Sequence, residues 1–98
     1  MDTQLDIHKL EEAAKKLKAM AHPLRIAIIE LLMAKEKLSV TEIHEKLKLE
    51  QAVTSHHLGI LKDKGVLDSV REGKNIYYKL KHNQISNIVS CINTCGDK

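Results

Sequence analysis

The sequence predicts a mainly α-helical domain of five helices with one small two-stranded β-hairpin. Apolar spacing, helix caps and helix breakers indicate helices at about 6–20, 23–33, 39–47, 51–64 and 82–94. Alternation of apolar and polar residues with a period of two occurs over 76–80 and indicates a strand. The 98 residues, 43% of them hydrophobic, are enough for a single domain, 1–98, with a thin core.

The first two helices are predicted on either side of a proline. Asp6 to Met20 carries apolar residues at i, i+3, i+4 and i+7, which is typical of an amphipathic helix. Pro23 suits the first position of the next helix, because the N–H that it lacks would be unpaired there in any case. The second helix is apolar nearly all round, so we place it at the centre of the domain.

Two further helices are predicted around a tight turn. Ser39 and Glu42 have the spacing of a capping box and begin the third helix. Residues 48–50 form the turn, and the helix over 51–64 follows it. Gly65 then ends that helix as a left-handed C-cap.

A hairpin and a last helix complete the chain. The predicted strands are 66–71 and 76–80, joined by the turn Glu72-Gly73-Lys74-Asn75. The last helix is predicted from His82 to Thr94. Two short helices joined by a tight turn and followed by a hairpin with a basic tip form a winged helix-turn-helix, here with five helices and a two-stranded wing.

The excess positive charge of the chain is confined to residues 51–81. This segment has six bases and three acids, and the remaining residues have ten of each. The charged residues of the segment are Lys62, Lys64, Arg71, Lys74, Lys79 and Lys81 against Asp63, Asp68 and Glu72. Such a distribution suits contact with phosphates, and an ordinary solvated face is the alternative.

The predicted architecture indicates which residues would contact DNA. The second helix of a helix-turn-helix lies in the major groove with its N-terminal residues at the base edges. A glutamine can bind adenine through two hydrogen bonds, and hydroxyls and imidazoles can reach phosphates or bases. The candidate DNA-binding residues are Gln51, Thr54, Ser55, His56 and His57 on the helix, with Arg71 and Lys74 beside the wing tip.

Other classes of protein are disfavoured by composition. No apolar run approaches the roughly 20 residues of a membrane span, and the polar segment 1–9 does not have the pattern of a secretory signal. The two cysteines do not suggest disulfide stapling, so we expect a reducing, cytoplasmic location. We find no nucleophile–base pair, paired acid site or phosphate loop, and we therefore expect no enzymatic activity.

Several motifs together resemble the ArsR/SmtB family of bacterial repressors. They are Ala21-His22-Pro23-Leu24-Arg25, Leu38-Ser39-Val40-Thr41-Glu42-Ile43, the segment 51–61, Gly65-Val66-Leu67 and the wing over 71–80. The resemblance covers nearly the whole chain. It implies a homodimer formed by the first and last helices, which binds a double-stranded DNA operator and is released by a metal ion or a chemical signal. One departure is Glu50 at the N-cap of the recognition helix, where the family usually has serine.

The inducer sites of the family match this chain poorly. The Cys-x-Cys pair of the arsenic and cadmium type falls on Ser39 and Thr41, so that site is absent. The second helix lacks the cysteine of the persulfide-sensing type. The positions of the zinc type hold two residues that can bind metal and two poor ligands, namely His82 and Cys95 against Gln84 and Lys98.

Cys91 and Cys95 are the remaining candidate sensor. They are four residues apart on the predicted last helix and so share one face. With His82 they could bind a soft divalent metal ion, or react with a thiol-directed signal. The alternative is that both cysteines only pack, in which case the protein is a DNA-binding dimer with no inducer. A winged-helix module that binds protein in place of DNA is the other alternative.

Overall fold

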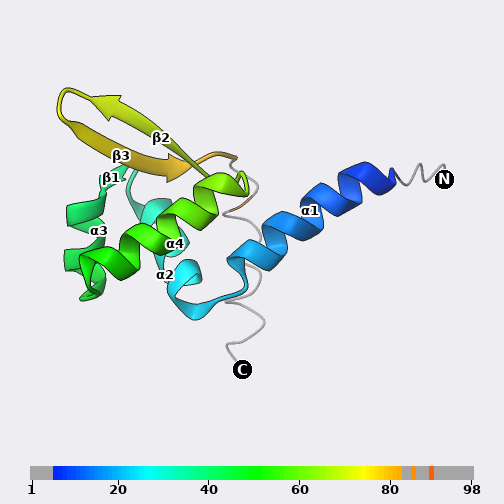
Figure 1. Cartoon of the computed structure of the whole chain (residues 1–98), viewed down its shortest axis with the longest axis horizontal. Coiled ribbons are helices and arrows are strands. Elements are labelled where there is room, and N and C mark those ends of the chain that lie inside the picture. Colours follow the sequence, from blue (N-terminus) through cyan, green and yellow to red (C-terminus); the bar gives the residue numbers. More distant parts are fainter. Residues whose placement is uncertain (1–5, 83–84, 86–88, 90–98) are drawn as a thin grey trace.

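The computed structural model describes residues 6–82, 85 and 89 of the chain. Over these residues the elements are α1 (Ile7–Met20), α2 (Pro23–Ala34), β1 (Leu38–Ser39), α3 (Val40–Leu47), α4 (Gln51–Asp63), β2 (Leu67–Glu72) and β3 (Asn75–Leu80). Helices α2, α3 and α4 lie together, the hairpin of β2 and β3 projects from one side of them, and most of α1 extends away (Figure 1). This is the predicted winged helix-turn-helix.

Side-chain hydrogen bonds to the backbone begin α1, α2 and α3, but not α4. Asp6 and His22 begin α1 and α2 by accepting backbone N–H groups, at 3.0 Å and 3.2 Å respectively. The predicted capping box is confirmed: Ser39 Oγ accepts from the Glu42 N–H at 3.2 Å, and the Glu42 carboxylate accepts from the Ser39 N–H at 2.9 Å. Glu50 makes no side-chain hydrogen bond at the start of α4, because glutamate is a poor N-cap.

The end of α4 sets the direction of the chain into β2. Gly65 has a φ of 82°, and its N–H donates to the Lys62 carbonyl at 3.1 Å. The Val66 N–H donates to the Leu61 carbonyl at 2.9 Å, which completes a Schellman motif. A Cβ at position 65 would also lie 3.2 Å from the side chain of Lys16. The predicted glycine C-cap is therefore confirmed.

The core lies between α2 and α4, where side chains from most elements meet. Ile28, Ile29 and Leu32 of α2 face Leu58 and Leu61 of α4, and all five are 3% exposed or less. The other buried apolar residues are Ala19, Met20, Leu38, Ile43, Val66, Leu67, Ile85 and Val89. Burying a leucine or isoleucine side chain contributes roughly 1.5–3 kcal/mol, so this cluster provides most of the driving force for folding.

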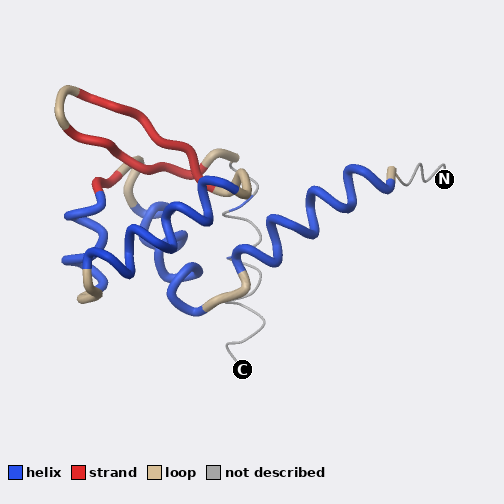
Figure 2. The backbone as a smooth tube through the Cα atoms, viewed as in Figure 1, coloured by secondary structure: helices blue, strands red, loops and turns tan. Residues whose placement is uncertain are grey.

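The sheet differs from the prediction, because it has three strands and not two. The two-residue strand β1 pairs antiparallel with β3, with Leu38 opposite Tyr78 and Ser39 opposite Tyr77, so the strand order is β1-β3-β2 (Figure 2). A strand this short shows no alternation in the sequence. Of the predicted fifth helix, Ile85 and Val89 are described and are helical, and most of the remainder lies outside the described residues.

Helix α1 leaves its apolar stripe uncovered in the single chain. Ile7 is 61% exposed, and Leu10 and Leu17 are each 49% exposed. An apolar groove of about 560 Å³ runs beside the stripe, and its lining includes Met20 and Ile85. Within the described part of the chain, only the C-terminal end of α1, at Ala19 and Met20, is buried.

Candidate nucleic-acid interface

A three-residue turn, 48–50, sets the angle between α3 and α4. Lys48 adopts the left-handed conformation, with φ 57° and ψ 44°, which is uncommon for a residue other than glycine. The Leu49 N–H donates to the His44 carbonyl at 3.0 Å, and the His44 ring Nδ1 in turn lies 3.2 Å from the Leu49 carbonyl oxygen. These contacts close the turn that joins the two helices.

The outward side of α4 is a continuous stripe of small and polar residues. Its exposed members are Gln51, Ala52, Ser55, His56, Gly59, Lys62 and Asp63. Residues at this spacing fall on one side of a helix. Three of the predicted DNA-binding residues, Gln51, Ser55 and His56, belong to this stripe, which we call the outward stripe of α4.

The prediction that Thr54 and His57 contact DNA requires correction. Their exposed fractions are 0% and 7%, so neither side chain is available to a ligand on the outward stripe. Both belong to the opposite, buried side of α4, together with Leu58 and Leu61. The four positions follow the i, i+3, i+4, i+7 spacing of a buried helix face, and packing therefore decides their orientation in spite of their polarity.

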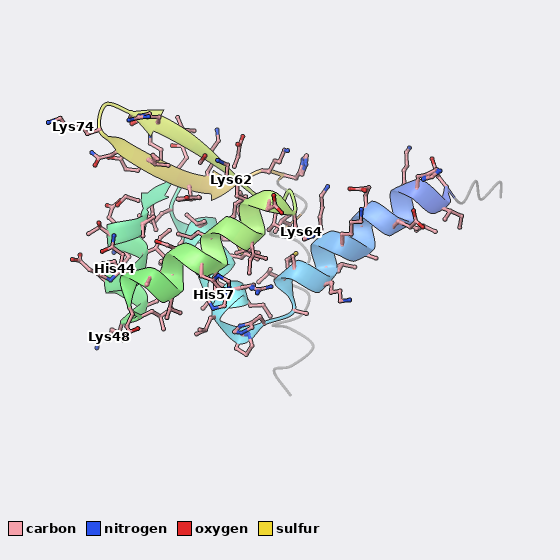
Figure 3. The ribbon with its side chains drawn as sticks, viewed as in Figure 1. His44, Lys48, His57, Lys62, Lys64 and Lys74 are labelled. Carbon is pink, nitrogen blue, oxygen red and sulfur yellow. The ribbon has the colours of Figure 1, made fainter. Side chains whose placement is uncertain are left out.

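His57 is held by contacts with the start of α2. The Arg25 guanidinium donates from Nε to His57 Nδ1 at 3.1 Å, and the His22 ring centroid lies 4.7 Å from that of His57. Figure 3 shows His57 beside α2. Burial lowers the pKa of His57, and the neighbouring His22, Arg25 and His56 lower it further. His57 is therefore a structural residue that orients α4.

The side-chain hydroxyl of Thr54 is buried and forms no hydrogen bond with the described residues. Its Oγ1 is inaccessible to solvent and makes no hydrogen bond within the described part of the chain. Burying an unpaired hydroxyl costs roughly 1–3 kcal/mol by comparison with mutational data. The unpaired hydroxyl of Thr54 is therefore expected to lower the free energy of unfolding.

The wing carries both predicted basic residues on exposed positions. Strands β2 and β3 are joined by the two-residue loop Gly73-Lys74, with Glu72 opposite Asn75. Gly73 has a φ of 64°, which the first position of such a loop requires. Arg71 and Lys74 are exposed, and Lys74 lies at the tip of the hairpin (Figure 3).

Lys37 neutralises an acidic residue at the base of the wing tip. Its Nζ donates to the Glu72 carboxylate and lies 5.3 Å from the centroid of the Tyr77 ring. The hydrogen bond to Glu72 raises the pKa of Lys37. The bridge offsets a negative charge that would otherwise oppose the approach of phosphates beside Arg71.

Lysines stand at the ends of the outward stripe and of the wing. Figure 3 shows Lys48 in the turn before α4, Lys62 near the end of α4 and Lys74 at the wing tip. An exposed stripe of small and polar side chains with a lysine near each end is suited to contact with base edges and phosphates.

Comparison with known proteins agrees with this geometry. Residues 20–70 match a family model described as a helix-turn-helix domain. The chain is 37% identical over 93 residues to the transcriptional repressor PagR of Bacillus anthracis, covering 95% of this chain and 93% of PagR. The crystal structure of PagR has a TM-score of 0.83 and covers 89% of this chain and 99% of the PagR chain.

Two further relatives identify the family. The HTH-type transcriptional repressor SmtB of Mycobacterium tuberculosis is 36% identical over 80 residues, which cover 82% of this chain and 58% of SmtB. A homodimeric winged helix-turn-helix domain from Mycobacterium bovis, Mb0332, a possible ArsR-family regulator, is 26% identical with a TM-score of 0.81, and covers 99% of this chain and 91% of that one. This chain belongs to the ArsR/SmtB family.

The predicted sensor residues of this ArsR/SmtB chain are only partly described. His82 is exposed, and Cys91 and Cys95 lie outside the described residues. At the position of the arsenic-type cysteine pair, the Oγ of Ser39 is used as the cap of α3. Within residues 6–82, 85 and 89, no cluster of three or more histidine, cysteine, aspartate or glutamate side chains could hold a metal ion.

Some residues of the candidate interface were not predicted from the sequence. Gly59 and Lys62 follow Ser55 by four and seven residues on the outward stripe, and this spacing alone would have found them. Lys37 is 35 residues from Glu72, so no local pattern could have indicated that bridge.

Proposed function

We propose that this protein is a homodimeric transcriptional repressor that binds a double-stranded DNA operator. The observation that supports the proposal is the outward stripe of α4 beside a wing with a basic tip. The first half of α4 would lie in the major groove, with Gln51, Ser55 and His56 at the base edges. Arg71 and Lys74 would contact the phosphate backbone or the adjacent minor groove.

The relatives support repression as the outcome of binding. PagR and SmtB are both named transcriptional repressors. A dimer that occupies an operator within a promoter blocks transcription by excluding RNA polymerase. In this role the protein would act in the cytoplasm, beside the chromosome. Among the described residues, no helix is both long enough and apolar enough to cross a bilayer.

The apolar stripe of α1 supports the dimer. Leu10 and Leu17 are each about half exposed, and Ile85 of the last helix lines the groove beside α1. A second copy of the chain would cover this surface with its own first and last helices. The Mb0332 domain is described as homodimeric, which agrees with this arrangement. In such a dimer the two α4 helices would lie about 34–36 Å apart, at half-sites one helical turn apart.

An inducer at the last helix is a separate part of the proposal. Cys91 and Cys95, with His82, would respond to a soft divalent metal or a thiol-reactive compound by lowering operator affinity. The test is the operator dissociation constant of the wild type and of Cys91→Ser/Cys95→Ser, before and after zinc, cadmium, oxidant and persulfide. An identical response in both proteins would mean that the cysteines only pack.

Selection from random DNA tests the function itself. The purified protein is used to enrich a pool of random duplexes, and the affinity for the enriched duplex is compared with that for a scrambled duplex of equal length. We expect a strong preference for the enriched duplex and an affinity that falls steeply as salt rises, because bound phosphates release counterions. Equal, weak binding to both duplexes would favour a winged-helix module that binds protein.

A further inference from the structure

A second basic surface lies away from the outward stripe of α4. It is a hollow of about 330 Å³ formed where α1, α2 and the end of α4 meet. Its lining residues are Lys15, Lys18, Ala19, Arg25, Ile60 and Lys64. The volume is several times the roughly 30 Å³ of a water molecule, so the hollow has room for a phosphate group. Figure 3 shows Lys64 at the end of α4, on the side of α1.

Four of the six lining residues are cationic, and none is acidic. Lys15 is partly neutralised, because its Nζ lies 3.3 Å from the carboxylate of Glu12. Lys18 and Lys64 form no ion pair with any carboxylate in the part of the chain that the structure describes. Like charges brought together by three elements repel one another, and a bound anion relieves that repulsion.

Arg25 is fixed in the hollow by two hydrogen bonds. It donates from Nε to His57 at 3.1 Å and from Nη1 to the carbonyl of Ala19 at 3.0 Å. Its other guanidinium hydrogens are therefore held in place, and they donate to no acceptor among the described residues. A planar guanidinium whose rotation is already restricted suits two-point recognition of phosphate oxygens.

The hollow faces a different direction from the outward stripe. Ile60 and Lys64 are four residues apart and share a side of α4, as Ser55 and Gly59 do on the outward stripe. Ile60 lies about 140° around the helix from Ser55 and about 100° from Gly59, and only His56, four residues before it at the edge of the outward stripe, lies close to its side. A duplex that occupies the outward stripe would thus leave the hollow at its flank.

We propose that this hollow is a binding site for a phosphate group, either on a small phosphorylated compound or on the DNA backbone beyond the half-site. Lys18 and Lys64 supply charge from two sides, and Arg25 supplies directed N–H groups. Because Arg25 also holds His57, an anion in the hollow acts on the same side chain that orients α4. The site is thereby linked to the recognition helix without contacting its outward stripe.

Binding of inorganic pyrophosphate to the purified protein tests the site without DNA. Isothermal titration calorimetry at constant ionic strength compares the wild type, Lys18→Gln/Lys64→Gln, and a control with the same loss of charge, Lys35→Gln/Lys46→Gln. All four lysines are exposed, so both variants should fold, and Arg25 is left unchanged because it holds α4. We expect one saturable site in the wild type and the control, and binding weaker by about tenfold or more in the first variant. Absence of saturable binding in the wild type, or equal affinity in the two variants, would overturn the proposal.

A second measurement identifies the source of the phosphate once pyrophosphate binding is established. The two variants are compared for affinity to the enriched operator, and wild-type binding is measured with and without saturating pyrophosphate. If the DNA backbone occupies the hollow, the Lys18/Lys64 variant binds operator more weakly than the control, and pyrophosphate competes with DNA. If a small compound occupies it, the two variants bind operator equally. Because the calorimetry contains no DNA, failure of the phosphate site is distinguishable from failure of the repressor proposal.

Discussion

The Arg25 guanidinium donates from Nε to the Nδ1 atom of His57 across 3.1 Å, and so joins α2 to the inner side of the recognition helix. A ring nitrogen that accepts a hydrogen bond carries no proton, so His57 is neutral in this arrangement. The same arginine donates to the carbonyl of Ala19, one of the two buried residues at the end of α1. The direction of the outward stripe of α4 therefore depends on a contact made on the opposite side of that helix.

The first prediction concerns acid. Because burial and its neighbours lower the pKa of His57 below the value of about 6.5 for an unfolded chain, the unfolded state binds this proton more readily. The contribution of neutral His57 to the free energy of unfolding should be fully present above a pH of about 6.5. The free energy of unfolding should then decrease as the pH falls from there towards the folded-state pKa. Urea denaturation at a series of pH values between neutrality and pH 5 measures the decrease.

His57→Gln is the control for the acid prediction, since glutamine keeps a polar side chain that does not titrate. We expect the variant to be less stable than the wild type at neutral pH and to lose less stability on acidification. Equal pH dependence in the two proteins would show that other groups cause the decrease.

The second prediction concerns the buried hydroxyl of Thr54. Valine has nearly the same shape without the unpaired Oγ1, so Thr54→Val should raise the free energy of unfolding by about 1 kcal/mol. Operator affinity should not change, because the side chain is fully buried. Chemical denaturation and fluorescence anisotropy measure the two quantities. A variant that folds normally but binds operator more weakly would restore Thr54 as a DNA contact.

The third prediction separates base contacts from phosphate contacts. Gln51→Ala and His56→Ala should each weaken binding to the enriched operator by roughly 1–3 kcal/mol, with little effect on scrambled DNA. Lys74→Ala should weaken binding to both duplexes alike and reduce the salt dependence. If the double variant of Gln51 and His56 kept wild-type affinity, the assignment of the outward stripe to the major groove would be falsified.

The fourth prediction concerns Gly59, in the middle of α4. A Cβ at this position would meet nothing within 4 Å, so the packing of the chain does not require glycine. Gly59→Ala should stabilise the protein by roughly 0.5–1 kcal/mol, because alanine has the higher helix propensity. The same methyl group should weaken operator binding by standing between α4 and the groove. Thermal denaturation and anisotropy should thus change in opposite directions, and parallel changes would contradict this role.

The fifth prediction concerns assembly. Leu10→Glu/Leu17→Glu places two charges on the exposed stripe of α1 and should yield a monomer with reduced operator affinity. Ile76→Glu is the matched control, because Ile76 is an apolar residue that is 45% exposed on the wing. Sedimentation velocity at micromolar concentration should show a dimer for the wild type and the control. A dimeric double variant would exclude α1 from the interface.

The fold was largely predictable because the signals that begin and end its helices are local in the sequence. The capping box of Ser39 and Glu42 and the left-handed Gly65 each depend on a few neighbouring residues, and the structure confirms both. Strand β1 was missed because two residues cannot show a period, and only its pairing with β3 defines it as a strand.

The candidate site was predictable as an element but not side chain by side chain. Polarity suggested that Thr54 and His57 face DNA, whereas their spacing with Leu58 and Leu61 assigns them to the core. What permits a histidine there is Arg25, which is 32 residues distant in sequence and leaves no local signal.

Ser39 belongs to two elements at once. It ends strand β1, where it pairs with Tyr77 of the wing, and its hydroxyl caps the first turn of α3. The wing and the helix pair therefore share a residue whose backbone and side chain are both engaged, and a hinge between them would break both contacts. Each protomer should move on its operator as one stiff body. In the proposed dimer, an inducer would then release DNA by altering the spacing and relative rotation of two rigid protomers. Adaptation to operators with a different half-site spacing would require changes in the dimer interface.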